Sequence, residues 1–220
     1  MRLADADDRT TRARLRDAAI DVFARDGFDA PVRTIADAAG VSPGLVIHHF
    51  GSKANLRAEC DAHVLRVTRE TNERALENGY GAGTFGGFAA LLDTVGANGP
   101  RVVYLIRSLQ SGGEMVRELF EHLAVDGEAT LRAGVAAGSI RPSIDETARA
   151  RHLLAQSVGA LLVDVVLHPP DDWSDAAAIV QGYVDRALLP GAELAVHGVM
   201  ADDSLLQIVL DYRKDHHDDC

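Results

Sequence analysis

Cysteine and aromatic residues are scarce in this sequence, and long apolar runs are missing from it. Two of the 220 residues are cysteines, Cys60 and Cys220, and Phe, Trp and Tyr together make up 5%. Two cysteines at these positions offer neither a disulfide framework nor the paired spacing of a zinc site. The most apolar stretch, residues 158–167, is about half as long as a membrane span and contains Asp164. Residues 1–10 hold no apolar segment of a secretory signal, so we expect a cytoplasmic protein with no membrane segment.

Sequence signatures of enzymes are missing as well: the chain has no nucleophile elbow, no HExxH and no P-loop. Residues 81–86 match the GxGxxG dinucleotide fingerprint, but a long predicted helix precedes them where that fingerprint requires a strand, so we interpret them as a loop. His48 and His49 are adjacent on a predicted helix and point about 100° apart, which prevents easy chelation of one ion. The His- and Asp-rich residues 216–220 we interpret as fortuitous metal affinity. We expect no cofactor and no bound metal, and a helical enzyme remains the alternative of a different class.

The net charge of −11 is unevenly distributed along the chain. Residues 1–57 hold nine Lys or Arg and eight Asp or Glu, whereas the remaining residues hold 13 and 25. Because phosphate binding depends on Lys and Arg, only the N-terminal part is suited to a nucleic-acid partner. Within it, residues 38–57 contain Lys53 and Arg57 and no acid, which indicates a small cationic surface. The Arg-rich residues 9–16 we interpret as a solvated face rather than a minor-groove arm.

Helical periodicity is what the sequence does contain. Apolar residues at spacings of three and four predict a helix over 10–26, and capping and breaking residues define shorter helices at 32–39 and 43–50. The same patterns continue to the C-terminal region, where a polar tail is expected to fray. The further helices are predicted at 54–78, 88–95, 102–109, 116–135, 148–167 and 176–189. We predict an all-α fold with an N-terminal three-helix domain over 1–53 and a helical domain over 54–220.

The segment PVRTIADAAGVSPGLVIHHFGSK, residues 31–53, is typical of a helix, a tight turn and a second helix. Gly40 permits the sharp reversal, Ser42 is suited to cap the second helix, and Pro43 fits its first position, where a missing N–H costs nothing. In a helix-turn-helix, the outer face of the second helix enters the major groove of DNA. The alternative is a helix-turn-helix that serves packing alone.

The longer stretch GFDAPVRTIADAAGVSPGLVIHHFGSKANLR resembles the DNA-binding domain of the tetracycline-repressor (TetR) family. The resemblance covers roughly residues 10–57; beyond them it rests on length, helicity and the GSIRPSID linker. It implies a homodimeric repressor on a palindromic double-stranded DNA operator, released by a small-molecule effector. Ile47 departs from the pattern, since the family often has a phosphate-binding Tyr there. By position, the resemblance implies that Leu45 and His48 face the groove, that His49 reaches the DNA backbone and that Lys53 binds phosphate, while Ile47 can offer only apolar contact. The residues that the helix-turn-helix and the resemblance together assign to DNA are Arg33, Thr34, Ser42, Pro43, Gly44, Leu45, Ile47, His48, His49 and Lys53.

The C-terminal domain is expected to carry dimerisation and effector binding. The helices predicted at 145–168 and 174–189 are apolar on more than one face, so one chain cannot easily bury both, and a second copy is expected to cover them. A regulator that senses no ligand remains an alternative. The polar side chains that could orient an effector are Tyr104, Arg107, Gln110, His122, His152, Gln156 and Tyr183.

Overall fold

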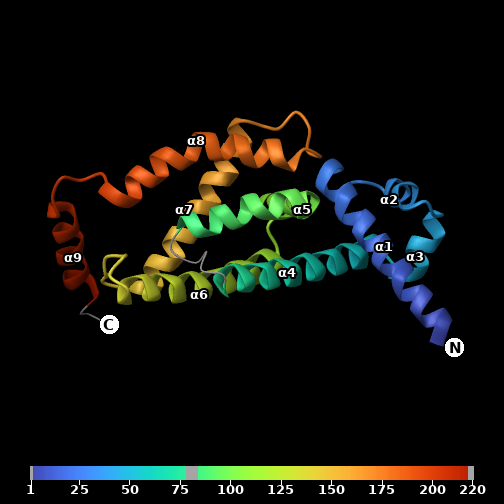
Figure 1. The fold of residues 1–220 in the computed structure, drawn as a ribbon, viewed down its shortest axis with the longest axis horizontal. Coiled ribbons are helices and arrows are strands. Elements are labelled where there is room, and N and C mark those ends of the chain that lie inside the picture. The colour runs from blue at the N-terminus through green and yellow to red at the C-terminus, as the bar shows by residue number, and fades with distance from the viewer. Residues whose placement is uncertain (1, 78–83, 218–220) are drawn as a thin grey trace. The chain divides into compact units, whose positions relative to one another are not determined.

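The computed structural model describes residues 2–77 and 84–217, which form helices joined by turns and loops (Figure 1). Within these ranges no residue lies in a strand, so the predicted all-α class is confirmed. The helices are α1 (Arg2–Asp26), α2 (Val32–Ala39), α3 (Pro43–Phe50), α4 (Lys53–Glu77), α5 (Thr84–Ser111), α6 (Glu114–Ala136), α7 (Glu146–Leu167), α8 (Ala176–His197) and α9 (Ser204–His217).

The first four helices follow directly from the sequence pattern. The predicted apolar stripe of α1 is fully buried at Leu15, Ala19, Val22 and Phe23. Helix α1 packs on α2, α4 and α5, and α3 packs on α2 and α4. Helices as short as α2 and α3 need such partners, because they are not stable alone. Helix α1 begins earlier than residue 10, where the prediction placed its start.

The later helices are longer than predicted, and two predicted helix breaks lie inside helices. The helices predicted at 88–95 and 102–109 form one helix, α5, which is kinked just before Gly99 and Pro100, where Asn98 has φ −140° and ψ 28°. Pro190, expected to end a helix, lies within α8. Of residues 81–86, interpreted as a loop, 81–83 lie outside the described residues and 84–86 instead form the start of α5. The C-terminal tail predicted to fray is helical as far as His217.

The spacing of Ser143 and Glu146 in the sequence predicts a capping box at the start of α7, and the structure shows it with a different N-cap. The side chain of Glu146 does accept a hydrogen bond from the N–H of Ser143, at 2.9 Å, as that motif requires. The N-cap is Asp145, however, whose carboxylate accepts the N–H of Ala148 at 2.9 Å. A carboxylate at the positive end of a helix is at least as good a cap as a serine hydroxyl, which accounts for the shift.

The chain divides into two compact units, residues 1–183 and 184–220. In the first unit α4 runs beside α6, and α6 packs along α7 (Figure 1). The domain boundary predicted at residue 53 lies inside this unit, at the first residue of α4, and stays a prediction. In the second unit α9 has large apolar side chains that are exposed, namely Leu205, Leu206, Ile208, Val209 and Tyr212.

Helix α7 is apolar but little buried. Only 11% of its most apolar window is buried, and Val163, Val166 and Leu167 are each more than half exposed. Among the described helices it is the one long and apolar enough to cross a membrane by length and composition. A helix that packs against a second protein chain passes the same test, because both surroundings select an apolar surface.

Candidate nucleic-acid interface

Helix α3 has one buried side and one free side. Val46 and Phe50 are 1% and 5% exposed and anchor the helix in the core of the N-terminal domain. On the opposite side Ile47 and His48 are exposed, as are Pro43 and Gly44 in the first turn. Leu45 and His49 are half-buried at the edges of this face. The free side of α3 therefore carries the groove-facing residues that the sequence predicted.

The turn between α2 and α3 holds that face in place. Gly40 has φ 69° and ψ 34°, a left-handed conformation that favours glycine, and Val41 donates its N–H to Ala36 at 2.9 Å. Ser42 is the N-cap of α3, and its hydroxyl accepts the N–H of Leu45. The sequence prediction of Gly40 as the reversal and Ser42 as the cap is confirmed.

The starts of α2, α3 and α4 are suited to phosphate. None of these three helices has an acidic residue in its first turn, so the positive end of each helix dipole is uncompensated. Ser52 caps α4 through the N–H of Asn55, at 3.1 Å, and Lys53 is the first residue of that helix. The helix starts provide partial positive charge, and Lys53 a full positive charge, next to the exposed face of α3.

Arg33 and Thr34 lie in the first turn of α2, as predicted. The Arg33 side chain is 84% exposed, and its ion pair with Asp37 is long, at 3.8 Å. Such exposed pairs contribute little stability, so the guanidinium can turn to another anion at low cost. Thr34 is half-buried. The DNA contacts assigned to all ten residues of the N-terminal domain, called the head below, stay predictions.

Arg12 holds α1, α3 and the start of α4 together, a role that the sequence did not reveal. Its guanidinium donates to the carbonyl of His49 at 2.6 Å, pairs with Glu59 on α4, and lies 4.6 Å from the ring centre of Phe50. The hydrogen bonds from Arg12 hold the pKa of Glu59 below its usual value. Part of the Arg-rich 9–16 segment therefore packs α1 against α3 and α4, instead of lying free in solvent.

Arg57 and Tyr104 connect the head to the C-terminal helices. The Arg57 guanidinium lies 3.1 Å from the ring centre of Phe28 and bonds the Asp61 carboxylate at 3.0 Å. The buried Tyr104 of α5 donates its hydroxyl to the same oxygen of Asp61 at 2.6 Å. Burial and this hydrogen bond raise the pKa of Tyr104, so its hydroxyl remains a donor. The first turns of α4 are thereby fixed to the α1–α2 turn and to α5.

The structure places four of the predicted effector residues against other groups or in the core, and three at the surface. Tyr104 is engaged with Asp61, and Arg107 donates to backbone carbonyls of α1. His122 lies 3.4 Å from Asp126 on α6, and Tyr183 is buried in α8. Gln110, His152 and Gln156 are exposed. Their roles as effector contacts stay predictions.

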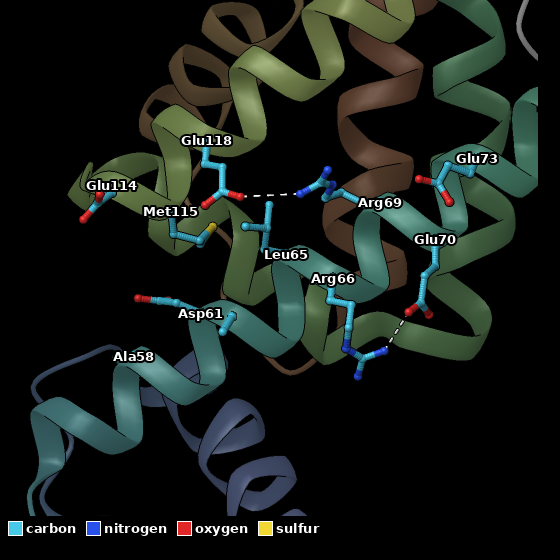
Figure 2. A pocket seen from close by; sticks show the side chains of 11 residues that line it. Ala58, Asp61, Leu65, Arg66, Arg69, Glu70, Glu73, Glu114, Met115 and Glu118 are labelled. Carbon is cyan, nitrogen blue, oxygen red and sulfur yellow. Dashed lines mark hydrogen bonds and ion pairs between the residues drawn. The ribbon is translucent and has the colours of Figure 1, made fainter.

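A groove with a volume of about 610 Å³ lies between α4 and the start of α6 (Figure 2). Leu65 and Met115 supply apolar surface, while ion pairs bridge Arg66 to Glu70 at 2.7 Å and Arg69 to Glu118 at 3.5 Å. None of the seven predicted effector residues lines it. The lining residues are Ala58, Asp61, Ala62, Leu65, Arg66, Arg69, Glu70, Glu73, Glu114, Met115 and Glu118.

Metal ligation finds no support in the described part of the chain, where no group of three His, Cys, Asp or Glu side chains is placed to hold an ion. The rings of His48 and His49 lie 5.6 Å apart at 71° to each other. Residues 218–220 of the His- and Asp-rich tail lie outside the described residues.

Two family models match the chain, one on each side of the α4 connection. The model of bacterial regulatory proteins of the tetR family matches residues 15–60, and the model of the Tetracyclin repressor-like C-terminal domain matches residues 97–201. A curated relative, the HTH-type transcriptional regulatory protein RaaS of Mycobacterium tuberculosis, is 38% identical over 210 residues, which are 96% of this chain and 95% of the relative.

Solved structures of bacterial regulators share the fold at lower identity. SmeT, the repressor of the Stenotrophomonas maltophilia multidrug efflux pump SmeDEF, aligns with a TM-score of 0.58 at 20% identity over 86% of this chain and 96% of its own. FadR of Bacillus subtilis, solved with stearoyl-CoA, aligns with a TM-score of 0.57 at 16% identity over 86% and 99%.

These matches confirm the resemblance that the helix-turn-helix sequence indicated, and extend it over the C-terminal domain. The family and the curated relative are transcriptional regulators and not enzymes. With a relative 38% identical over nearly its whole length, the chain belongs to the TetR family of DNA-binding transcriptional regulators.

Proposed function

We propose that this regulator is a cytoplasmic repressor that binds a palindromic operator as a homodimer and leaves it when a small molecule binds the C-terminal domain. The observation that carries the proposal is the exposed face of α3, capped by Ser42, anchored by Val46 and Phe50, and flanked by helix starts without acidic residues. An exposed helix face beside the positive ends of helix dipoles is the kind of element that enters a major groove.

The apolar surface of α7 supports dimerisation. Val163, Val166 and Leu167 are exposed in the single chain, although water is a poor environment for such a stripe. A second copy that packs on α7 and α8 in a two-fold arrangement would cover it and would present two α3 helices to one DNA duplex. Half-sites would then lie about 34–36 Å apart or at a multiple of that spacing.

Helix α4 supports a route from effector to DNA. Its start is fixed to α1 of the head through Glu59, and its later turns contact α6 through Arg69 and through Asn72, whose amide donates to Asp126 at 2.6 Å. A ligand that displaces α6 therefore shifts α4, and with it the head. The B. subtilis FadR structure contains stearoyl-CoA, so the same fold can hold a small organic ligand.

Selection from a random duplex library by the purified full-length chain tests DNA binding and symmetry together. We expect enrichment of one inverted repeat with a fixed half-site spacing. A candidate effector, found by thermal shift, is then titrated calorimetrically against free dimer and operator complex, because coupling is reciprocal and the complex should bind it more weakly, by roughly 5–150-fold. Enrichment of no sequence would contradict the DNA-binding proposal, and equal affinities across a broad library would favour a regulator that senses no ligand.

A further inference from the structure

Three segments that are far apart in the sequence meet at the end of α1. Arg107 of α5 donates from Nε to the carbonyl of Ala24 and from Nη2 to the carbonyl of Arg25, each at 3.1 Å. The same guanidinium lies 3.7 Å from the ring centre of Trp173, in the loop between α7 and α8. One side chain of the C-terminal helices thus contacts both the head and the loop that joins the two predicted dimer helices.

The chemistry of a helix end explains why an arginine stands there. The last four carbonyls of a helix lack intrahelical partners, and α1 ends at Asp26, so Ala24 and Arg25 present acceptors that need donors. A cation at the negative end of the helix dipole is favourable, and a planar guanidinium can serve two carbonyls with its edge while it stacks on an indole with its face. Partial burial lowers the pKa of Arg107, but a guanidinium stays charged at neutral pH.

The α7–α8 loop is itself held against the head. Asp172 accepts the N–H and the hydroxyl of Ser174, both at 2.7 Å, which fixes the turn around Trp173. A cavity of about 100 Å³ marks the contact of this loop with α1 and with Pro100 of α5. At the adjacent start of α8, a Cβ on Gly99 would lie 3.1 Å from Ala176, so the backbones approach closely there. The loop therefore touches the head without passing through α4.

We propose that Arg107 and Trp173 are positioning residues that fix the angle between each head and the dimer helices, and thereby set the half-site spacing that the dimer accepts. This inference rests on the proposed function for the dimer and for the consequence on DNA. Besides α4, the contact of Arg107 and Trp173 is a second connection between the head and the dimer helices, and it lies at the C-terminal end of α1.

Spin-label distances between the two heads of the free dimer test the angle directly. The label is attached at position 38, which is exposed on α2, in a chain with the substitutions Ala38→Cys and Cys220→Ser. The remaining thiol, Cys60, stays unlabelled because it is fully buried and burial raises its pKa to about 12. We expect a narrow distance distribution in this chain and a broader or shifted one when Arg107→Lys or Trp173→Leu is added. Trp173→Phe, which retains an aromatic face, should keep the narrow distribution.

Arg132→Lys is the matched control, because Arg132 is 58% exposed on α6 and pairs only within its own helix among the contacts described, with Glu128 at 2.8 Å. It should change nothing. Unchanged distributions in both Arg107→Lys and Trp173→Leu would overturn the inference, and should one variant fail to fold, the other decides. If the labelled chain fails to form a dimer, the proposed function fails instead, which is a distinguishable result.

Binding to inverted repeats whose spacing is varied one base pair at a time provides the second readout. We expect Arg107→Lys and Trp173→Leu to reduce the preference for the best spacing at least about fivefold, the lower end of typical coupling strengths, with unchanged affinity for a single half-site. A merely structural role would lower stability and leave the spacing preference intact. An equal loss of affinity at every spacing would contradict the positioning role.

Discussion

Replacing Tyr104 by Phe removes one hydroxyl from the junction between α4 and α5 and leaves the ring packing unchanged. The Tyr104 ring is fully buried, and its hydroxyl donates to the Asp61 carboxylate at 2.6 Å. Hydrogen bonds to charged groups contribute about 1.5–3 kcal/mol. Asp61 keeps its bond to Arg57 and is 22% exposed to solvent, which compensates part of the loss. We therefore expect the free energy of unfolding to fall by about 1.5 kcal/mol, the lower end of that range.

Equilibrium urea denaturation at one fixed protein concentration measures this change, because the stability of a dimer depends on concentration. Tyr212→Phe is the control: Tyr212 is 61% exposed on α9, so the same chemical change there should stay within about 0.5 kcal/mol of wild type. A Tyr104→Phe variant as stable as the control would refute the reasoning that this hydroxyl fixes α4 to α5.

Three further predictions concern the head and the dimer surface. Lys53→Ala should weaken binding to all DNA sequences and flatten the plot of log affinity against log salt by about 0.9, one phosphate contact. Because Arg12 holds the pKa of Glu59 below its usual 4.5, the pair stabilises the fold above that pH and the gain is lost as the pH falls through the lowered pKa. Glu59→Gln should abolish this pH dependence of the free energy of unfolding, measured by acid titration. For so exposed a pair, the dependence amounts to under about 1 kcal/mol. Val166→Asp should raise the dimer dissociation constant in sedimentation, whereas Val125→Asp, equally exposed on α6, should not.

Local chemistry made the helix-turn-helix predictable. Gly40, Ser42 and Pro43 each act on their nearest neighbours, so their conformational roles are readable in a short stretch of sequence. The periodic burial of α1 follows for the same reason, since Leu15 and Phe23 need only one apolar neighbour surface.

Pairings over long sequence separations were not predictable. Arg12 pairs with Glu59, and Arg107 with Ala24, across different helices, and no spacing rule relates such residues in a single sequence. The helix end expected at Pro190 was wrong, since Pro190 lies inside α8. The sequence suggested Arg107 as an effector contact from its polarity alone, and the structure shows its guanidinium bonded to the end of α1.

The central claim, that the exposed face of α3 reads DNA sequence, is tested most directly by fluorescence anisotropy with a selected operator and a scrambled duplex at one salt concentration. The wild-type chain should bind the operator at least about a thousandfold more tightly than the scrambled duplex. A Leu45→Ala, His48→Ala variant should lose most of that ratio and keep its affinity for the scrambled duplex, because both side chains lie on the α3 face and neither is assigned to phosphate. A variant that keeps the wild-type ratio would contradict the claim.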